Sequence, residues 1–532
     1  MTRRTASVSG MLLASILCLP RPASAGCAEI EQFLADKASG VVCFHADDLR
    51  VPSPPTVPVT PANYSITTFA DGTPLPGVAF LGIIAFGAFT PVTDLGVISN
   101  GPAPTSTAVP GIQVEGWLAD DPAGEARFLL RFPDDWNGKL VVAGASGTRS
   151  EYNGDWAWSD YVVPKGYAYA SQNKGVLNLF IVALASPAQP NDTYSCRLNP
   201  SSQTWVHFYD NDVLVANYAS VLKDRLKPFT QWAQFMLDGA RLAQGALKAN
   251  YNHFPGRTYA VGTSNGGYQV RRAVEAAPDL FDGGVDWEGT FVDVRENILE
   301  TLPPAIENFP GYIAGGCDPN GPEATAIRAA GYPPDIVTTC TADASPTDGR
   351  FGTLWGHYSA QFWEVTQCQW QKRFDPAWDT YGLNGGTGSY EYLARVNGGF
   401  VDVAQLSDSA TTGKIKKPLI TVAGTMDALL PIRKQAEAYE DKVNASRKGN
   451  NAKREAQYRL YEVQNGNHIE SYIPLFPGKL ELIQPHAQRA FDLLVDHVEN
   501  NAPLPPSQCI PKGGSLSSSP SEPGRCPSLL VP

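Results

Sequence analysis

The 532-residue sequence has fewer basic than acidic residues, no pair of cysteines or histidines at a spacing typical of zinc sites, and no long apolar run outside its first residues. Its 41 Lys and Arg against 53 Asp and Glu give a formal net charge of −12 at pH 7, which argues against nucleic acid or an anionic membrane as a partner. After residue 25, no run approaches the roughly 20 apolar residues of a membrane span. No Cys-x-x-Cys or His-x-x-x-His spacing indicates zinc. A small or oligomeric, uncharged ligand is favoured, and no metal is expected.

The composition is that of a folded protein. Hydrophobic residues make up 43% of the chain and charged residues 18%, which indicates a globular rather than a disordered chain. The length allows one large domain with insertions, or two domains. The sequence contains no internal repeat, and it does not reveal the oligomeric state.

The first 25 residues are typical of an export signal. A basic start precedes an apolar run at 11–19, and small residues at 23–25 resemble a cleavage site, so we expect the mature protein to begin near Gly26. In an alternative reading Cys27 is lipidated, but Ser24 stands where a large apolar residue is usual. The sequence thus predicts a secreted or periplasmic protein.

Eight cysteines remain after removal of the signal. An even number in an exported chain indicates disulfide bonds. Short spacings favour three local pairs and leave one distant pair, although spacing alone does not settle the connectivity. The expected pairs are Cys27 with Cys43, Cys317 with Cys340, Cys509 with Cys526, and Cys196 with Cys368.

Short apolar segments alternate with helical stretches from residue 114 onward. Segments such as "KLVVAGASG", "TYAVGTS", "PLITVAG" and "YRLYEVQNG" are typical of strands, whereas 229–251 and 432–446 have the periodicity of helices. This alternation predicts an α/β fold with a mostly parallel sheet, whose sites lie at the carboxyl ends of strands.

The alternation stops near residue 291 and resumes near 418. The interval is too long for a structureless loop and is rich in tryptophan, so it predicts an inserted lid or cap. The turn-rich segment before residue 110 is either packed on the main domain or partly a linker. The expected division is signal peptide 1–25, N-terminal extension 26–110, a first core segment 111–290, inserted lid 291–415, a second core segment 416–505, and C-terminal tail 506–532.

The stretch "TYAVGTSNGGYQV" predicts a nucleophilic serine. Gly262-Thr263-Ser264-Asn265-Gly266 fits the G-x-S-x-G elbow between a strand and a helix, in which small flanking residues permit a sharp turn that exposes the serine hydroxyl. The pattern alone is weak, but the preceding strand and following helix match what an elbow requires. The alternative is a glycine-rich turn without catalytic function.

In this fold the acid and then the base follow the serine along the chain. Asp427 follows the strand "PLITVAG" and His468 follows "YRLYEVQNG", so we expect Ser264, Asp427 and His468 to form a catalytic triad. Each has a structural alternative: Asp427 as a helix cap and His468 as a loop histidine. Glu288, which ends the strand "GGVDW", is the reserve acid.

Two further predictions concern the oxyanion and the substrate. The Asn265 amide at a helix start, together with the amide of Ala145 or Ser146 after the strand "KLVVAG", is expected to bind the oxyanion. Trp156 and Trp158 could line an apolar or aromatic pocket, although such residues more often belong to the core.

The segments "WNGKLVVAGASG", "GTSNGGYQ", "PDLFDGGVDWEG", "PLITVAGTMDALLP" and "YRLYEVQNGNH" resemble the tannase and feruloyl esterase family, over roughly residues 130–290 and 415–475. The resemblance implies an α/β-hydrolase with a large lid, and the triad Ser264, Asp427 and His468. The family typically has cysteines immediately before its serine and after its histidine, where this chain has Thr263 and Ile469, so it would be a divergent member. The family's lid often carries structural calcium, but no ligand loop matches here and no cofactor is assigned.

These observations predict a secreted serine ester hydrolase that acts on an aromatic or hydroxyacid ester. Because Ser-Asn-Gly-Gly is also similar to the sequence in secreted hydroxybutyrate-oligomer hydrolases, an aliphatic polyester oligomer is one alternative substrate. A serine peptidase or amidase is a second alternative. A third is a binding protein that has the hydrolase fold without its catalytic activity. The identity of the acyl and alcohol groups is not legible from the sequence.

Overall fold

The computed structural model describes most of the chain after the predicted signal. Several parts of the chain lie outside the described residues: the predicted signal, most of the segment between 51 and 110, Cys368 and Trp378. The described residues are 26–50, 107–120, 126–147, 151–152, 154–174, 177–182, 195–197, 204–209, 229–341, 352–363, 366–367, 370–371, 374–375, 390–447 and 458–532.

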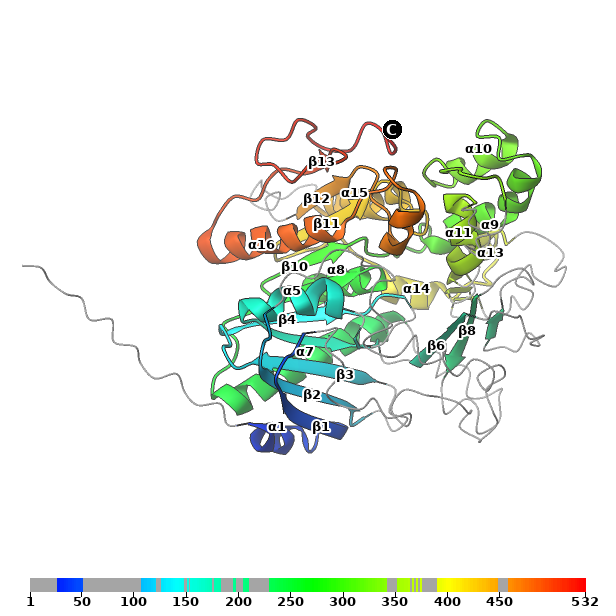
Figure 1. Ribbon diagram of the computed structural model, residues 1–532. Helices are drawn as coiled ribbons and strands as arrows, with labels where there is room; N and C mark the ends of the chain where they lie inside the picture. The colour runs from blue at the N-terminus through cyan, green and yellow to red at the C-terminus, as the bar shows by residue number, and fades with distance from the viewer. Residues whose placement is uncertain are drawn as a thin grey trace, which may run out of the picture.

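A ten-stranded sheet runs through the centre of the molecule (Figure 1). Its spatial order is β1-β2-β3-β5-β4-β9-β10-β11-β12-β13. The pairs from β5 to β13 are parallel, whereas β1, β2, β3 and β5 pair antiparallel. The strands are β1 (Ala38–Ala46), β2 (Gly111–Leu118), β3 (Arg127–Pro133), β4 (Lys139–Gly144), β5 (Ala168–Gln172), β9 (Arg257–Thr263), β10 (Gly283–Trp287), β11 (Leu419–Gly424), β12 (Tyr458–Val463) and β13 (Gln508–Ile510).

The central strands are mostly apolar because both faces of the sheet are covered. In β4, Leu140 and Val142 pack in one hydrophobic layer, whereas Val141 and Ala143 pack in the layer on the opposite face. This is the period of two expected from a strand, and continuous apolar runs are typical of parallel strands buried on both sides. The predicted α/β fold with a mostly parallel sheet is confirmed.

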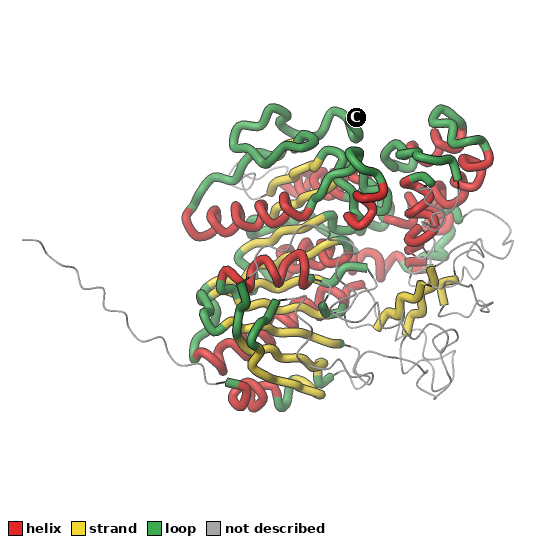
Figure 2. The backbone as a smooth tube through the Cα atoms, viewed as in Figure 1, coloured by secondary structure: helices red, strands yellow, loops and turns green. Residues whose placement is uncertain are grey.

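Helices cover the two faces of the sheet (Figure 2). The cluster on one face contains buried residues of α1, α7, α8 and α15, and the cluster on the other face contains those of α5 and α16. The bounds are α1 (Cys27–Leu34), α5 (Asp160–Val162), α7 (Phe229–Tyr251), α8 (Asn265–Ala276), α15 (Ala436–Arg447) and α16 (Gln484–Asn500), with short helical turns at η1 (Asp155–Ser159), η2 (Val163–Lys165), η5 (Ile432–Lys434) and η7 (Glu470–Leu475).

Between β10 and β11 the chain forms a helical segment that lies to the right of the sheet in Figure 1. Its aromatic core includes the buried Trp355 and Trp363 and extends to Met426 and Ile469, which flank Asp427 and His468. Its helices are α9 (Ile298–Ala314), α10 (Pro322–Ala329), α11 (Leu354–Tyr358), η4 (Ser359–Trp363), α13 (Tyr392–Asn397) and α14 (Val403–Ser409). A small antiparallel sheet, β6 (Leu177–Val182), β7 (Ser195–Arg197) and β8 (Thr204–Tyr209), is separate from the main sheet.

Three of the predicted disulfide bonds are confirmed. Cys27 joins Cys43, Cys317 joins Cys340 and Cys509 joins Cys526. The fourth expected pair, Cys196 with Cys368, involves a residue outside the described stretches of the chain. Among the described helices, none combines the length and the apolar character needed to cross a membrane.

Candidate active site

Four chemically reactive residues follow four adjacent parallel strands. Ser264 comes directly after β9, Glu288 after β10, Asp427 in the loop after β11, and His468 in the loop after β12. Because these strands are neighbours and run in one direction, their carboxyl ends share one edge of the sheet. Ser264, Asp427 and His468 are all buried.

The turn at Ser264 has the geometry of a nucleophile elbow. Ser264 adopts φ 59° and ψ −123°, a left-handed conformation that is strained for a residue with a side chain. A Cβ on Gly262 would lie 2.5 Å from the carbonyl carbon of Gly266, and one on Gly266 would lie 2.7 Å from that of Gly144. Both glycines are therefore required by the close approach of β4, β9 and α8.

The imidazole of His468 is held by Asp427. His468 Nδ1 lies 2.8 Å from Asp427 Oδ2, and Asp427 Oδ1 accepts hydrogen bonds from the amides of Leu429 at 2.8 Å and Leu430 at 2.7 Å. The carboxylate is thus fixed at both oxygens, which orients the imidazole.

The opposite nitrogen of the ring is available. His468 Nε2 is buried and has no hydrogen-bond partner among the described residues. It forms no hydrogen bond with the Ser264 hydroxyl in this structure, and in the absence of substrate such contacts are often long. The arrangement leaves Nε2 able to accept a proton.

A second carboxylate, Glu288, lies at the same ring nitrogen. Its Oε2 is 3.2 Å from His468 Nδ1, and its Oε1 accepts a hydrogen bond from the Gly424 amide at 2.9 Å. Burial lowers the pKa of His468, but the carboxylates of Asp427 and Glu288 outweigh burial and raise it. Burial, followed by the charge of Asp427, raises the pKa of Glu288 against the opposing effect of His468.

The neighbouring acid Asp286 has a structural role. Its carboxylate pairs with Arg271 at 2.5 Å, with both side chains fully buried, and accepts hydrogen bonds from Thr421 Oγ1 at 2.8 Å and the Gly289 amide at 2.6 Å. These contacts tie α8 to β10 and β11. Asp286 is therefore engaged away from the histidine.

The backbone amides that the sequence predicts as oxyanion donors differ in their hydrogen bonding. Asn265 is the first residue of α8, so its amide has no carbonyl partner within the helix and is suited to an anion. The Ala145 amide instead donates to the buried Gln269 Oε1 at 2.9 Å. This hydrogen bond engages the Ala145 amide, so of the two predicted second donors the backbone of Ser146, also buried, is the better candidate.

A buried lysine, which sequence reasoning missed, holds the same loop. Lys174 follows β5 with a left-handed φ of 67°, and its Nζ donates hydrogen bonds to the carbonyl oxygens of Ser146 and Gly147. Carbonyls that bind a cation are drawn toward it, which constrains the peptide units of the loop. A polar residue at the carboxyl end of a core strand was the available sequence signal.

The two predicted pocket tryptophans are not both described. The Trp156 side chain lies outside the described residues. Trp158 is fully buried and packs edge-on against Trp287 and Phe491, with ring centroids 6.3 and 6.4 Å away. Trp158 therefore belongs to the core beneath α16, which does not support the predicted substrate contact.

Tyr358 of the inserted segment supports the histidine loop. Its hydroxyl donates to Asn467 Oδ1 at 2.9 Å and accepts from the Ile469 amide at 3.2 Å, so it contacts both neighbours of His468. Burial raises the pKa of Tyr358 well above its usual range, so the hydroxyl remains neutral. A single tyrosine in an irregular region gave no sequence signal of this role.

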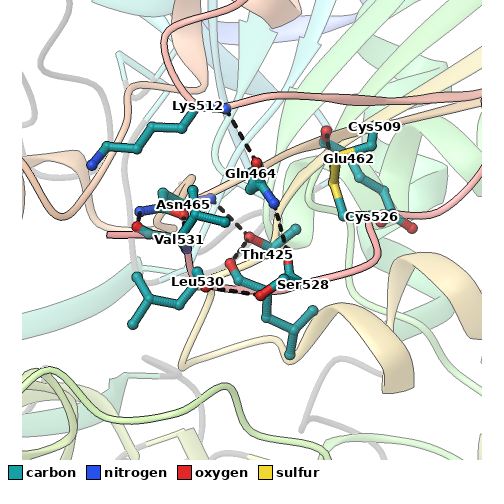
Figure 3. The surroundings of a disulfide bond; sticks show 11 residues. Thr425, Glu462, Gln464, Asn465, Cys509, Lys512, Cys526, Ser528, Leu530 and Val531 are labelled. Atoms are coloured by element: carbon teal, nitrogen blue, oxygen red, sulfur yellow. Dashed lines mark hydrogen bonds between the residues drawn. A yellow bond between two sulfur atoms is a disulfide. The ribbon is translucent and has the colours of Figure 1, made fainter. Parts of the chain in front are cut away.

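The segment after the last disulfide contacts Thr425 and Asn465, in the loops that lead to Asp427 and His468 (Figure 3). The Asn465 side chain pairs with the backbone of Val531, accepting from its amide at 2.9 Å and donating to its carbonyl at 2.8 Å. Thr425 Oγ1 donates to the Leu529 carbonyl and accepts from the Asn465 amide at 2.9 Å. Residues 529–531 therefore support Thr425, two residues before Asp427, and Asn465, three residues before His468.

Comparison with known proteins gives a partial match to a family. A family model described as 3HB-oligomer hydrolase (3HBOH) matches residues 394–528. The matched stretch includes Asp427 and His468 but begins after Ser264 and Glu288. The D-(-)-3-hydroxybutyrate oligomer hydrolase of Burkholderia thailandensis is 34% identical over 110 residues, which are 20% of this chain and 15% of that protein. The chain thus matches only a small fraction of the length of this curated relative.

Similar solved structures cover more of the chain at lower identity. Feruloyl esterase B from Aspergillus oryzae is 13% identical, covers 94% of this chain and 95% of its own, and has a TM-score of 0.47. Tannin acyl hydrolase from Aspergillus niger is also 13% identical, covers 81% of this chain and 85% of its own, and has a TM-score of 0.46.

Proposed function

We propose that this protein is a serine carboxylic ester hydrolase that acts through an acyl-enzyme. The observation that carries the proposal is the combination of Ser264 in a strained turn with a buried His468 and Asp427 pair at the same edge of the sheet. A serine hydroxyl is a weak nucleophile, and a neighbouring imidazole oriented by a carboxylate is the usual means of activating it.

In the proposed reaction, His468 Nε2 takes the proton of Ser264 as the oxygen attacks the ester carbonyl. Asp427 keeps the other imidazole proton on Nδ1 and stabilises the imidazolium that forms. The Asn265 amide, together with that of Ser146, binds the negative oxygen of the tetrahedral intermediate. His468 then gives its proton to the leaving alcohol, and water releases the acid by the same steps.

We propose an oligomer of a short hydroxyacid, such as 3-hydroxybutyrate, as the substrate. The match of residues 394–528 to the 3HB-oligomer hydrolase model supports this choice, because the matched stretch carries two of the three triad residues. An aromatic ester such as a gallate or ferulate is the second candidate, supported by the resemblance of the core motifs to tannases and feruloyl esterases.

We also propose that the protein works outside the cytoplasm. Three disulfide bonds, including one that ties down the C-terminal segment, support this location, because such bonds persist in oxidising compartments.

The test is hydrolysis of a small panel by the purified protein. The panel contains a 3-hydroxybutyrate dimer and trimer, a gallate ester, a ferulate ester, a terephthalate monoester, and an amide matched to the best ester. We expect the hydroxybutyrate oligomers to be cleaved fastest, and Ser264→Ala to reduce kcat by about 10⁴-fold or more. Near-normal activity of Ser264→Ala, or faster cleavage of the amide, would contradict the proposed function.

A further inference from the structure

Two carboxylates converge on one nitrogen of His468. Asp427 Oδ2 and Glu288 Oε2 lie 2.8 and 3.2 Å from Nδ1, and all three side chains are almost completely buried. The two acids come from different strands, and each is anchored separately by backbone amides. A triad mechanism requires only one of them, so the second needs an explanation.

The geometry assigns unequal roles to the two acids in the resting structure. Nδ1 carries a single hydrogen, and we assign its hydrogen bond to Asp427 Oδ2, because that oxygen lies 2.8 Å from Nδ1 whereas Glu288 Oε2 lies 3.2 Å away. Glu288 Oε2 is therefore a buried oxygen next to a donor that is already engaged. Burying a polar atom without a well-placed donor costs free energy, so its presence here calls for an explanation, such as a role in another state of the reaction.

The backbone at Glu288 is also strained. Its φ is 51°, in the left-handed region that residues with side chains rarely adopt. The Glu288 amide donates to the Val422 carbonyl at 2.8 Å, while its Oε1 accepts from the Gly424 amide. Contacts with β11 at both ends of the residue thus hold its carboxyl group beside His468.

We propose that Glu288 is a second positioning acid for His468, able to accept the Nδ1 hydrogen when Asp427 does not. The proposal rests on the proposed function of Ser264, Asp427 and His468 as a triad. In the reaction the Ser264 proton moves to Nε2, the Nδ1 hydrogen stays in place, and the resulting imidazolium is flanked by both carboxyl groups.

Glu288 should therefore influence the protonation of His468. Among the described residues, Asp427 and Tyr358 face this pair, and Tyr332 faces Asp427. Burial raises the pKa of both tyrosines, so they remain neutral. Removing the Glu288 carboxylate removes one of two charges that raise the pKa of His468. The imidazole then stays neutral to lower pH, and the acid limb of kcat/KM should move to lower pH by about one unit or more.

The experiment compares Asp427→Asn, Glu288→Gln and the double variant, with p-nitrophenyl butyrate as the substrate. Replacing the acid of a triad by its amide commonly reduces kcat by about 10⁴-fold. We expect Asp427→Asn to lose only about 10²-fold, because Glu288 accepts the Nδ1 hydrogen, and the double variant to lose the full 10⁴-fold. Glu288→Gln alone should show the shifted acid limb.

A matched control is Glu462→Gln. Glu462 is another buried glutamate, whose pKa burial raises to about 8, but it contacts the Cys526 amide rather than His468. We expect this variant to leave the acid limb in place. A purely structural role for Glu288 would lower thermal stability in Glu288→Gln without moving the pH profile.

The proposal is overturned if the double variant equals Asp427→Asn and Glu288→Gln leaves the acid limb unchanged. Should Glu288→Gln fail to fold, Asp427→Asn alone decides: retention of about 1% of kcat supports the proposal, and a loss of about 10⁴-fold contradicts it. Because donor atoms of Glu288, Asp427 and His468 lie within 4.8 Å of one another, a bound cation is the competing explanation. Loss of wild-type activity on treatment with EDTA would overturn the proposal. Failure of the proposed function itself appears separately, as an active Ser264→Ala variant.

Discussion

The substitution Gly266→Ala tests whether the elbow and the loop after β4 form one unit. The added Cβ would lie 2.7 Å from the carbonyl carbon of Gly144 and 3.3 Å from that of Ala145. Carbon atoms prefer separations of at least 3.5 Å, so the backbone at Gly144 would have to move by about 0.8 Å relative to α8. The displaced loop carries Ser146, the predicted second oxyanion donor.

The expected loss follows from this displacement. A misplacement of about 1 Å costs about 10²-fold in rate, and loss of one oxyanion donor costs about 10²- to 10³-fold. We therefore expect Gly266→Ala to reduce kcat on p-nitrophenyl butyrate by about 10²- to 10³-fold, with KM much less affected. Overpacking should also reduce the free energy of unfolding by about 1–3 kcal/mol, measurable by urea denaturation.

The matched control is Gly239→Ala in α7. A Cβ there would meet only Gln172 Cγ at 3.8 Å, an ordinary contact distance. This variant should keep the wild-type kcat and gain about 0.5–1 kcal/mol in stability, because alanine is the better helix former. If Gly266→Ala retained kcat within about twofold of the wild type, the coupling between the elbow and the loop would be wrong.

Two further predictions concern stability. Arg271→Met leaves the fully buried Asp286 without its ionic partner, so we expect a loss of about 3–5 kcal/mol in urea denaturation; a loss below about 1 kcal/mol would mean that Thr421 and Gly289 suffice. Asp335, whose pKa burial raises to about 7, binds its proton more tightly folded than unfolded. Its contribution to stability is therefore greatest below about pH 4 and is lost as pH rises through 7. Asp335→Asn should flatten this dependence in thermal denaturation between pH 5 and 8, and an unchanged slope would refute the assignment.

The local patterns of the sequence predict the central fold well. The segments 139–147, 258–264, 418–424 and 458–466 are mostly apolar runs that end in glycine or polar residues, and each overlaps an observed strand. The three local disulfides could also be predicted, because short separations in the sequence limit the possible partners of each cysteine. The strands and the local disulfides could be predicted because they depend on residues that are close together in the sequence.

The features that sequence reasoning missed depend on distant contacts. The amide of Ala145 donates to Gln269, which is 124 residues away, a pairing that no local pattern around Ala145 indicates. The edge strands β1 and β13 join the sheet by pairing with distant segments, which no local periodicity reveals. Tryptophan is a residue type that often lines pockets, but Trp158 is covered by α16.

The support of the Asp427 and His468 loops by residues 529–531 links the candidate site to the order of synthesis. A growing chain contains Ser264, Asp427 and His468 more than 60 residues before it contains Val531, the backbone partner of Asn465. The loops that carry Asp427 and His468 therefore obtain these contacts only after residues 529–531 have been translated. The 17-residue separation between Cys509 and Cys526 is closed by oxidation, a step favoured outside the cytoplasm. The contacts that support the Asp427 and His468 loops therefore form later than the triad residues themselves are made.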